Sequence, residues 1–288
     1  MDRKTLLAVL SACVLLSSTT SCSKQTAIVV GSKNFTEQVL LGEILAQQIE
    51  RRLHVPVVRK LDLGGTLLAH EALTSGSIDL YPEYTGTALT AVLKRPPLGD
   101  AKAVFDAVHE AYQRQWQLAW MKPLGFNNTF AMVVRRDEKT TTLSGAARER
   151  AWKLGMGYEF RERPDGLDGL LKAYHLRLSG DPVTMDLGLL YTALQSRKVD
   201  MAAANSTDGM LSVLDVAVLD DDRHYFPPYE CAAVVRESTL MRYPSLRAAL
   251  EELSGRLTDS VMRNLNYQVD GKHRPAAEVA EEFLRGAP

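Results

Sequence analysis

The stretch Ala-Leu-Thr-Ser-Gly-Ser-Ile-Asp-Leu-Tyr-Pro-Glu-Tyr-Thr-Gly-Thr, residues 72–87, predicts a helix end, a tight turn, a short buried strand and a loop. Gly76 can adopt the left-handed conformation that ends a helix, and the apolar residues 78–81 suit a buried parallel strand. Pro82 has no N–H to donate within a sheet, so we expect the strand to end there. Open α/β sheets bind ligands beyond the carboxyl ends of their strands, which makes the following loop a candidate site.

A similar pattern recurs in the second half of the chain. Residues 193–200 match residues 72–79 as Ala-Leu-x-Ser-x-x-(Ile/Val)-Asp, and Tyr84 and Asn205 then fall at the same offset from the two aspartates. One interpretation is that helix-turn-strand units of any α/β protein look alike. The other is a protein of two similar lobes, each presenting one loop to a shared cleft, as in a two-lobed binding protein.

Composition excludes some classes of function. The 288 residues are 45% hydrophobic and 24% charged with a formal net charge of −1, which is typical of a globular protein with one or two cores. The near-neutral charge, without a long basic run, gives no support for nucleic-acid binding.

The six histidines are scattered and pair with no nucleophile, so we expect no enzyme, no metal site and no cofactor. Cys231 lies in an apolar run and is predicted to be a buried packing residue.

The N-terminus predicts export. A basic start, the apolar residues 6–16 and a small-residue end are typical of a signal peptide over residues 1–22. The position of Cys22 resembles that of the lipidated cysteine of bacterial lipoproteins, so we expect a membrane-anchored protein on the periplasmic or cell-envelope side. The alternative is ordinary cleavage and a soluble periplasmic product. No later apolar segment is long enough to span a bilayer.

The rest of the chain alternates between strand and helix patterns, as expected of parallel sheets. Expected strands are residues 27–30, 57–63, 78–81, 153–156, 183–185, 199–204 and 217–219. Expected helices begin near residue 36 and cover residues 66–76, 101–118, 167–174, 187–196, 245–253, 257–267 and 276–284. The stiff segment 225–229 is interpreted as a return crossover. These patterns predict lobe 1 from residues 26–129 and 228–288, and lobe 2 from residues 130–227.

Two segments of the sequence have features of an anion-binding site. Asn34 and Glu37 have the spacing of a capping box, and a helix start beside Lys33 could hold an anion. The alternative is a capped helix with a solvated lysine. Arg161 and Arg163 precede another helix and could grip a carboxylate, or they form a surface pair with neighbouring glutamates.

Seven ordered segments resemble the substrate-binding proteins of ABC importers for osmoprotectant quaternary amines such as glycine betaine, choline and carnitine. They are Gly31-Ser32-Lys33 with Phe35-Thr36-Glu37-Gln38; Leu63-Gly64-Gly65-Thr66; Ile78-Asp79 with Tyr81-Pro82-Glu83-Tyr84-Thr85-Gly86-Thr87; Glu159-Phe160 with Arg163 and Asp165-Gly166; Met185-Asp186 with Gly188-Leu189; Ser206-Thr207-Asp208-Gly209; and Phe226-Pro227-Pro228-Tyr229. The resemblance implies an α/β, two-lobed type II periplasmic-binding fold with two crossover hinge segments. It also implies a monomer that delivers its ligand to an ABC permease.

The resemblance further implies a ligand site of two halves. An aromatic cage would hold a quaternary ammonium, which has no N–H, by cation–π attraction of about 0.5–2 kcal/mol per ring. Its walls would be Tyr84, Phe130 and Tyr229. The groups facing the anionic end would be Lys33, Thr87 and Arg163.

The ligand itself stays open at this point. Relatives with a full cage tend to carry tyrosine at the positions of Phe130, which keeps a ring, and Asn205, which offers an amide instead. A larger betaine, ergothioneine or another zwitterion is therefore an alternative to glycine betaine. A ligand-sensing module without transport is a second class, and an enzyme on the same fold is a third. Cys231 and Glu83 are the only weak candidates for catalysis.

Overall fold

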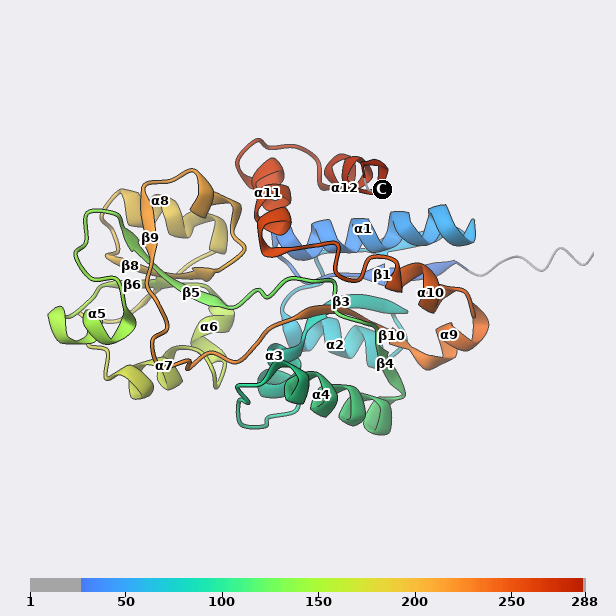
Figure 1. Cartoon of the computed structure of the whole chain (residues 1–288), viewed down its shortest axis with the longest axis horizontal. Coiled ribbons are helices and arrows are strands. Elements are labelled where there is room, and N and C mark those ends of the chain that lie inside the picture. The colour runs from blue at the N-terminus through green and yellow to red at the C-terminus, as the bar shows by residue number, and fades with distance from the viewer. Residues whose placement is uncertain (1–26, 287–288) are drawn as a thin grey trace, which may run out of the picture.

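The computed structural model describes residues 27–286, which form two lobes, each built on a five-stranded mixed sheet (Figure 1). The predicted signal peptide and Cys22 lie outside the described residues. Lobe 1 has the strand order β2-β1-β3-β10-β4, with β1 (Ile28–Gly31), β2 (Val57–Lys60), β3 (Leu80–Tyr84), β4 (Leu118–Trp120) and β10 (Cys231–Arg236). Lobe 2 has the order β7-β6-β8-β5-β9, with β5 (Phe130–Arg135), β6 (Leu154–Met156), β7 (Val183–Thr184), β8 (Met201–Asn205) and β9 (Val216–Val218).

The two sheets repeat one arrangement. β3 pairs parallel with β1 and antiparallel with β10, while β8 pairs parallel with β6 and antiparallel with β5. Tyr84 and Asn205 are the last residues of the equivalent strands β3 and β8. This confirms the interpretation of the sequence repeat as two similar lobes. The expectation of parallel sheets was wrong for β5 and β10, because each follows a crossover and runs antiparallel to its neighbours.

Helices cover both faces of each sheet. In lobe 1 they are α1 (Thr36–Leu53), α2 (Thr66–Thr74), α3 (Thr85–Thr87), the π-helix η1 (Ala88–Val92), α4 (Ala101–Trp116), α9 (Glu237–Arg242), α10 (Leu246–Glu251), α11 (Asp259–Asp270) and α12 (Ala276–Arg285). In lobe 2 they are α5 (Leu143–Glu149), α6 (Tyr158–Glu162), α7 (Leu167–Tyr174), the 3₁₀ turns η2 (Leu187–Leu189) and η3 (Gly209–Ser212), and α8 (Leu190–Gln195). Within residues 27–286, no helix is both long and apolar enough to cross a membrane.

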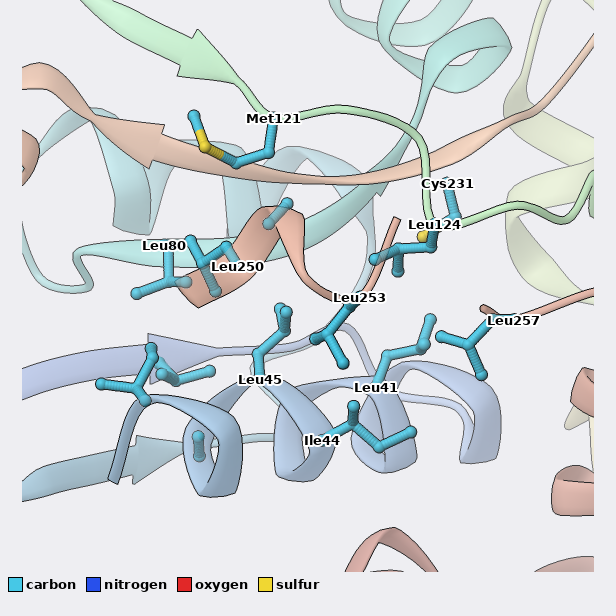
Figure 2. Close-up of a cluster of buried hydrophobic side chains, with 14 of the residues drawn as sticks. Leu41, Ile44, Leu45, Leu80, Met121, Leu124, Cys231, Leu250, Leu253 and Leu257 are labelled. Carbon is cyan, nitrogen blue, oxygen red and sulfur yellow. The ribbon is translucent and has the colours of Figure 1, made fainter. Parts of the chain in front are cut away.

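The largest core of lobe 1 lies between its sheet and α1, α10 and α12. The periodic apolar face of α1 supplies Leu41 and Leu45, which point toward Leu250 and Leu253 in Figure 2. Cys231 is fully buried in this core, as the sequence predicts. A second core packs α2 and α4 on the opposite face of the sheet, which fixes the position of β3 between two helical layers.

The chain crosses between the lobes twice, just before β5 and just before β10, and the two crossovers run side by side (Figure 1). The N–H of Asn128 donates to the carbonyl of Tyr229 at 3.2 Å, and the N–H of Tyr229 donates to Asn127 Oδ1 at 2.6 Å. The segment 225–229 is thus the return crossover, as predicted.

Two local predictions were wrong. Pro82 lies inside β3, opposite Ala233, instead of ending the strand. It is tolerated because β1 pairs with β3 only at Leu80, so no ladder bond toward β1 is lost at Pro82. The expected capping box is also absent: α1 begins at Thr36 after Phe35, without a side-chain cap. Glu37 bonds to other partners, which are described below.

Candidate functional site

A cavity of about 640 Å³ lies between the lobes, with walls from both sheets and both crossovers. Tyr84 and Asn205, at the ends of the equivalent strands, both line it. The cavity brings together all seven residues that the sequence assigns to the site: Lys33, Tyr84, Thr87, Phe130, Arg163, Asn205 and Tyr229. Their contact with a ligand stays a prediction, but the fold places them around one space.

Lys33 does not present a free charge to this cavity. Its Nζ donates to Glu83 Oε1 at 2.5 Å and to Thr66 Oγ1 at 3.1 Å. Lys33 is 2% exposed and Glu83 is fully buried, so the alternative of a solvated lysine is wrong. Glu83 also accepts hydrogen bonds from Tyr81 Oη at 2.9 Å and from the N–H of Tyr84 at 2.7 Å. The carboxylate therefore fixes Lys33 and the end of β3 at the same time.

Arg163 is likewise paired, but not with the glutamates that the sequence suggests. Its Nε and Nη2 donate to the two oxygens of Asp165 at 2.9 and 2.6 Å, and its Nη1 donates to Thr87 Oγ1 at 2.8 Å. The guanidinium carbon lies 4.9 Å from the ring centroid of Phe130 and 5.5 Å from that of Tyr229. Burial acts to raise the pKa of Asp165, but the hydrogen bonds and charge of Arg163 hold that pKa below its usual value.

Glu37 is a hydrogen-bond acceptor at the cavity that the sequence analysis did not assign to the site. Its Oε1 accepts from Tyr84 Oη at 2.6 Å and from Asn128 Nδ2 at 2.7 Å, while its Oε2 accepts from Thr207 Oγ1 at 2.5 Å and Asn266 Nδ2 at 2.8 Å. Burial raises the pKa of Glu37, and the four donors oppose that shift. The spacing from Asn34 was the one available signal, and it favoured a capping box.

Hydrogen bonds join the lobes on both sides of the cavity. On one side, Thr90 Oγ1 of η1 donates to Asp165 Oδ2 at 2.8 Å, and Tyr229 Oη donates to the same oxygen at 2.5 Å. On the other side, Thr207 of lobe 2 reaches Glu37 of lobe 1. The structure therefore has the lobes in contact across the cleft.

The lobe 2 wall is acidic near Asn205. Asp208 Oδ2 accepts from Tyr191 Oη at 2.8 Å and from the N–H of Asn205 at 3.2 Å. Burial raises the pKa of Asp208 to about 7, and the nearby charges of Glu37 and Asp270 also contribute. The structure thus places a carboxyl group of variable charge beside the predicted site residue Asn205.

Asp208→Asn is expected to flatten the pH dependence of folding stability. Between the usual pKa of 3.8 and the folded value of about 7, folded Asp208 holds a proton that the unfolded chain has released. The wild type therefore loses stability as pH rises through this window, by up to about 1.4 kcal/mol per pH unit from this group. Urea unfolding of both proteins at pH 5 and 7.5 measures the difference. If the free energy of unfolding changes equally with pH in both proteins, Asp208 does not titrate in this window.

Comparison with known proteins identifies the family. Residues 26–286 match the family described as the substrate binding domain of ABC-type glycine betaine transport systems. The chain is 35% identical to the ergothioneine transport permease/ergothioneine binding protein EgtU of Helicobacter pylori, over 89% of this chain and 47% of that protein, and so spans about half of it. It is 31% identical to the carnitine transport binding protein OpuCC of Listeria monocytogenes, over 91% of this chain and 87% of that protein. It is 35% identical to a glycine-betaine-binding protein of Pseudomonas aeruginosa, over 89% of this chain and 86% of that protein.

A solved structure described as a glycine betaine/carnitine/choline ABC transporter superposes with a TM-score of 0.76 at 32% identity, covering 90% of this chain and 97% of that one. Lactococcal OpuAC in its closed form with glycine betaine has a TM-score of 0.63 at 14% identity, covering 90% of this chain and 95% of that one. At this identity the similarity supports the fold alone. The fold is the two-lobed type II periplasmic-binding fold that the resemblance implied. The chain belongs to the family of substrate-binding domains of ABC-type glycine betaine transport systems.

Proposed function

We propose that this protein captures a small zwitterion or quaternary amine outside the cytoplasm and delivers it to an ABC permease. The observation that carries the proposal is the cavity between the lobes, whose walls include Tyr84, Phe130 and Tyr229. Binding there stabilises the state in which both lobes contact the ligand, and a permease can distinguish that state from the open one. The names of the relatives make glycine betaine, carnitine and ergothioneine the first ligands to test.

The aromatic wall is suited to positive charge. Resident cations already lie near its rings, with Lys33 Nζ 5.1 Å from the centroid of Tyr84 and Arg163 near Phe130 and Tyr229. A quaternary ammonium cannot donate a hydrogen bond, so attraction to ring faces is the main specific contact available to it. Tyr84, Phe130 and Tyr229 remain our proposed ring contacts, with Asn205 contributing a polar contact on the lobe 2 side.

The proposal extends to the ends of the chain and to its assembly. Residues 1–22 would direct export, and Cys22 would carry a lipid anchor that holds a monomer beside its permease. Lobe 1 would comprise residues 26–129 and 228–288, and lobe 2 residues 130–227. The positions of β5 to β9 between the two crossovers support this division.

Quaternary amines are expected to raise the melting temperature of the purified protein. Ligand at 100 times its Kd stabilises the native state by about 2.7 kcal/mol, or roughly 5 °C or more for a chain of this size. A thermal-shift screen should include betaines, choline, carnitine, ergothioneine and ordinary amino acids. A response to an amino acid but to no quaternary amine would contradict the proposed ligand class.

Two substitutions at one position separate the ring from the hydroxyl. Tyr84→Phe keeps the aromatic face and should keep most of the ligand-induced shift, whereas Tyr84→Leu should lose most of it. Each shift is measured against the same variant without ligand, because both changes remove the hydrogen bond to Glu37. Equal ligand shifts in the two variants would show that the ring does not contact the ligand.

A further inference from the structure

The cavity is larger than a small quaternary amine. Its volume of about 640 Å³ lies within the range of pockets for drug-sized ligands, about 300–1,000 Å³. A compound as small as glycine betaine fills no more than roughly 250 Å³, at about 30 Å³ for each water-sized group. More than half of the cavity therefore remains for a part of the ligand that lies beyond the ring wall of Tyr84, Phe130 and Tyr229.

One face of the segment from η2 to α8 lines the cavity on the lobe 2 side. Gly188, Tyr191, Thr192 and Gln195 all border the cavity, at positions i, i+3, i+4 and i+7. This spacing is that of a single helical face. The helix therefore presents a continuous wall to the cleft, not one isolated side chain.

Asn205 connects this helical face to the ring wall. In the sheet of lobe 2, Asn205 lies directly opposite Phe130, so their side chains are neighbours on one face of the sheet. On its other side, Asp208 Oδ2 accepts from the N–H of Asn205 at 3.2 Å and from Tyr191 Oη of α8 at 2.8 Å. A ligand with its ammonium group beside Phe130 therefore extends past Asn205 toward α8.

Three polar side chains of this wall make no hydrogen bond within residues 27–286. Thr192 and Gln195 are exposed and Asn205 is half-buried, and none of the three donates or accepts through its side chain. Each carries both a donor and an acceptor, in a hydroxyl group for Thr192 and an amide for the other two. The wall can therefore donate to a ligand and accept from it at the same time.

Polar groups on the other walls are already bonded within the protein. Lys33 and Arg163 are each paired with a buried carboxylate. On the lobe 1 side, Asn266 Nδ2 donates to Glu37 Oε2 at 2.8 Å. A ligand that bonds to these groups must compete with bonds inside the protein, whereas bonds to the lobe 2 wall replace only water.

We propose that Thr192, Gln195 and Asn205 form a second subsite, which binds an uncharged substituent of the quaternary amine that both donates and accepts hydrogen bonds, such as a carbamoyl or amide group. The inference rests on the function proposed above and adds the part of the ligand beyond the ammonium group. None of the three residues lies in the seven segments that resemble the family, so the subsite is not part of that resemblance.

Two ligands of equal charge and nearly equal shape isolate the hydrogen bond. Carbamoylcholine ends in an NH₂ group and acetylcholine in a CH₃ group at the same position, while choline lacks the whole acyl group. Isothermal titration of the purified protein at pH 7.5 is expected to give about tenfold tighter binding of carbamoylcholine than of acetylcholine. This is the size expected for one hydrogen bond that the methyl group cannot make.

Variants of the α8 face test the assignment. Gln195→Met keeps the length of the side chain and removes the amide, and Thr192→Val keeps the shape and removes the hydroxyl. The variant with both substitutions is expected to bind carbamoylcholine and acetylcholine within about threefold of each other. Gln113→Met is the matched control, since Gln113 is exposed on α4 and does not line the cavity. It should leave the ratio of the two dissociation constants unchanged.

The outcomes separate this inference from the proposed function. If none of the three ligands binds, both fail. If choline binds but carbamoylcholine binds no more tightly than acetylcholine, the second subsite is overturned while binding of quaternary amines stands. If carbamoylcholine is preferred but the double variant keeps the wild-type ratio, the assignment to Thr192 and Gln195 is overturned. The wild-type titrations need no variant, so they decide the preference for a hydrogen-bonding substituent even if a substitution unfolds the protein.

Discussion

Lys33→Met is expected to lower the free energy of unfolding by about 3–5 kcal/mol, because it leaves a buried carboxylate without its cation. Glu83 is fully buried, and Lys33 Nζ is its one charged partner within hydrogen-bonding distance among the described residues. Methionine retains most of the volume of the lysine stem, so packing is largely kept. Urea unfolding with tryptophan fluorescence measures the change.

A double variant shows whether the loss comes from the unpaired charge. Lys33→Met combined with Glu83→Gln removes both charges and should recover much of the stability lost in Lys33→Met alone. Lys122→Met breaks the exposed pair with Glu251 and should cost less than about 1 kcal/mol. If the losses of unfolding free energy in Lys33→Met and Glu83→Gln simply add in the double variant, the buried pair is not coupled as the structure indicates.

Glu37→Gln is expected to cost about 3 kcal/mol, although it changes a single atom. Each oxygen of Glu37 accepts from one asparagine amide, Asn128 on Oε1 and Asn266 on Oε2. In either orientation, the new Nε2 group faces one of these two amide donors, and that donor loses its partner. Because Thr207 of lobe 2 binds the same carboxylate, the contact between the lobes should weaken as well.

Urea unfolding and small-angle X-ray scattering test the two parts of this prediction. The variant should be less stable, and its radius of gyration without ligand should exceed that of the wild type. Thr207→Val removes one donor and should cost only about 1 kcal/mol. Unchanged stability in Glu37→Gln would show that the four hydrogen bonds do not form together in solution.

Much of the fold follows from local patterns in the sequence. The repeated helix-turn-strand pattern correctly makes Tyr84 and Asn205 equivalent in the two lobes, because burial between two helical layers favours the same short apolar strand in each lobe. Both residues were expected in the loops after these strands, whereas they are the last residues of β3 and β8. Short helices were harder to predict from the sequence. Residues 158–162 were expected to be a loop but form α6, which is too brief for an apolar period to show.

The electrostatics of the site could not be predicted in the same way. Lys33 and Glu83 lie fifty positions apart, and Glu159 meets Thr66 from the other lobe. Such pairs depend on how the lobes pack, which local spacing does not contain. Arg163 shows the opposite case: its partner Asp165 is only two residues away and both side chains are buried, whereas the alternatives from the sequence were a ligand carboxylate or a surface pair with glutamates.

The strand order also determines how a newly made chain can fold. β10 lies between β3 and β4, so the sheet of lobe 1 stays incomplete until residues 231–236 have been synthesised. All strands of lobe 2 come from residues 130–218, so the lobe made second can be complete first. Until β10 arrives, β3 and β4 lack a partner between them, and unpaired strand edges favour aggregation. The N-terminal half, although made earliest, therefore obtains its complete sheet only after the C-terminal strand β10 has been made.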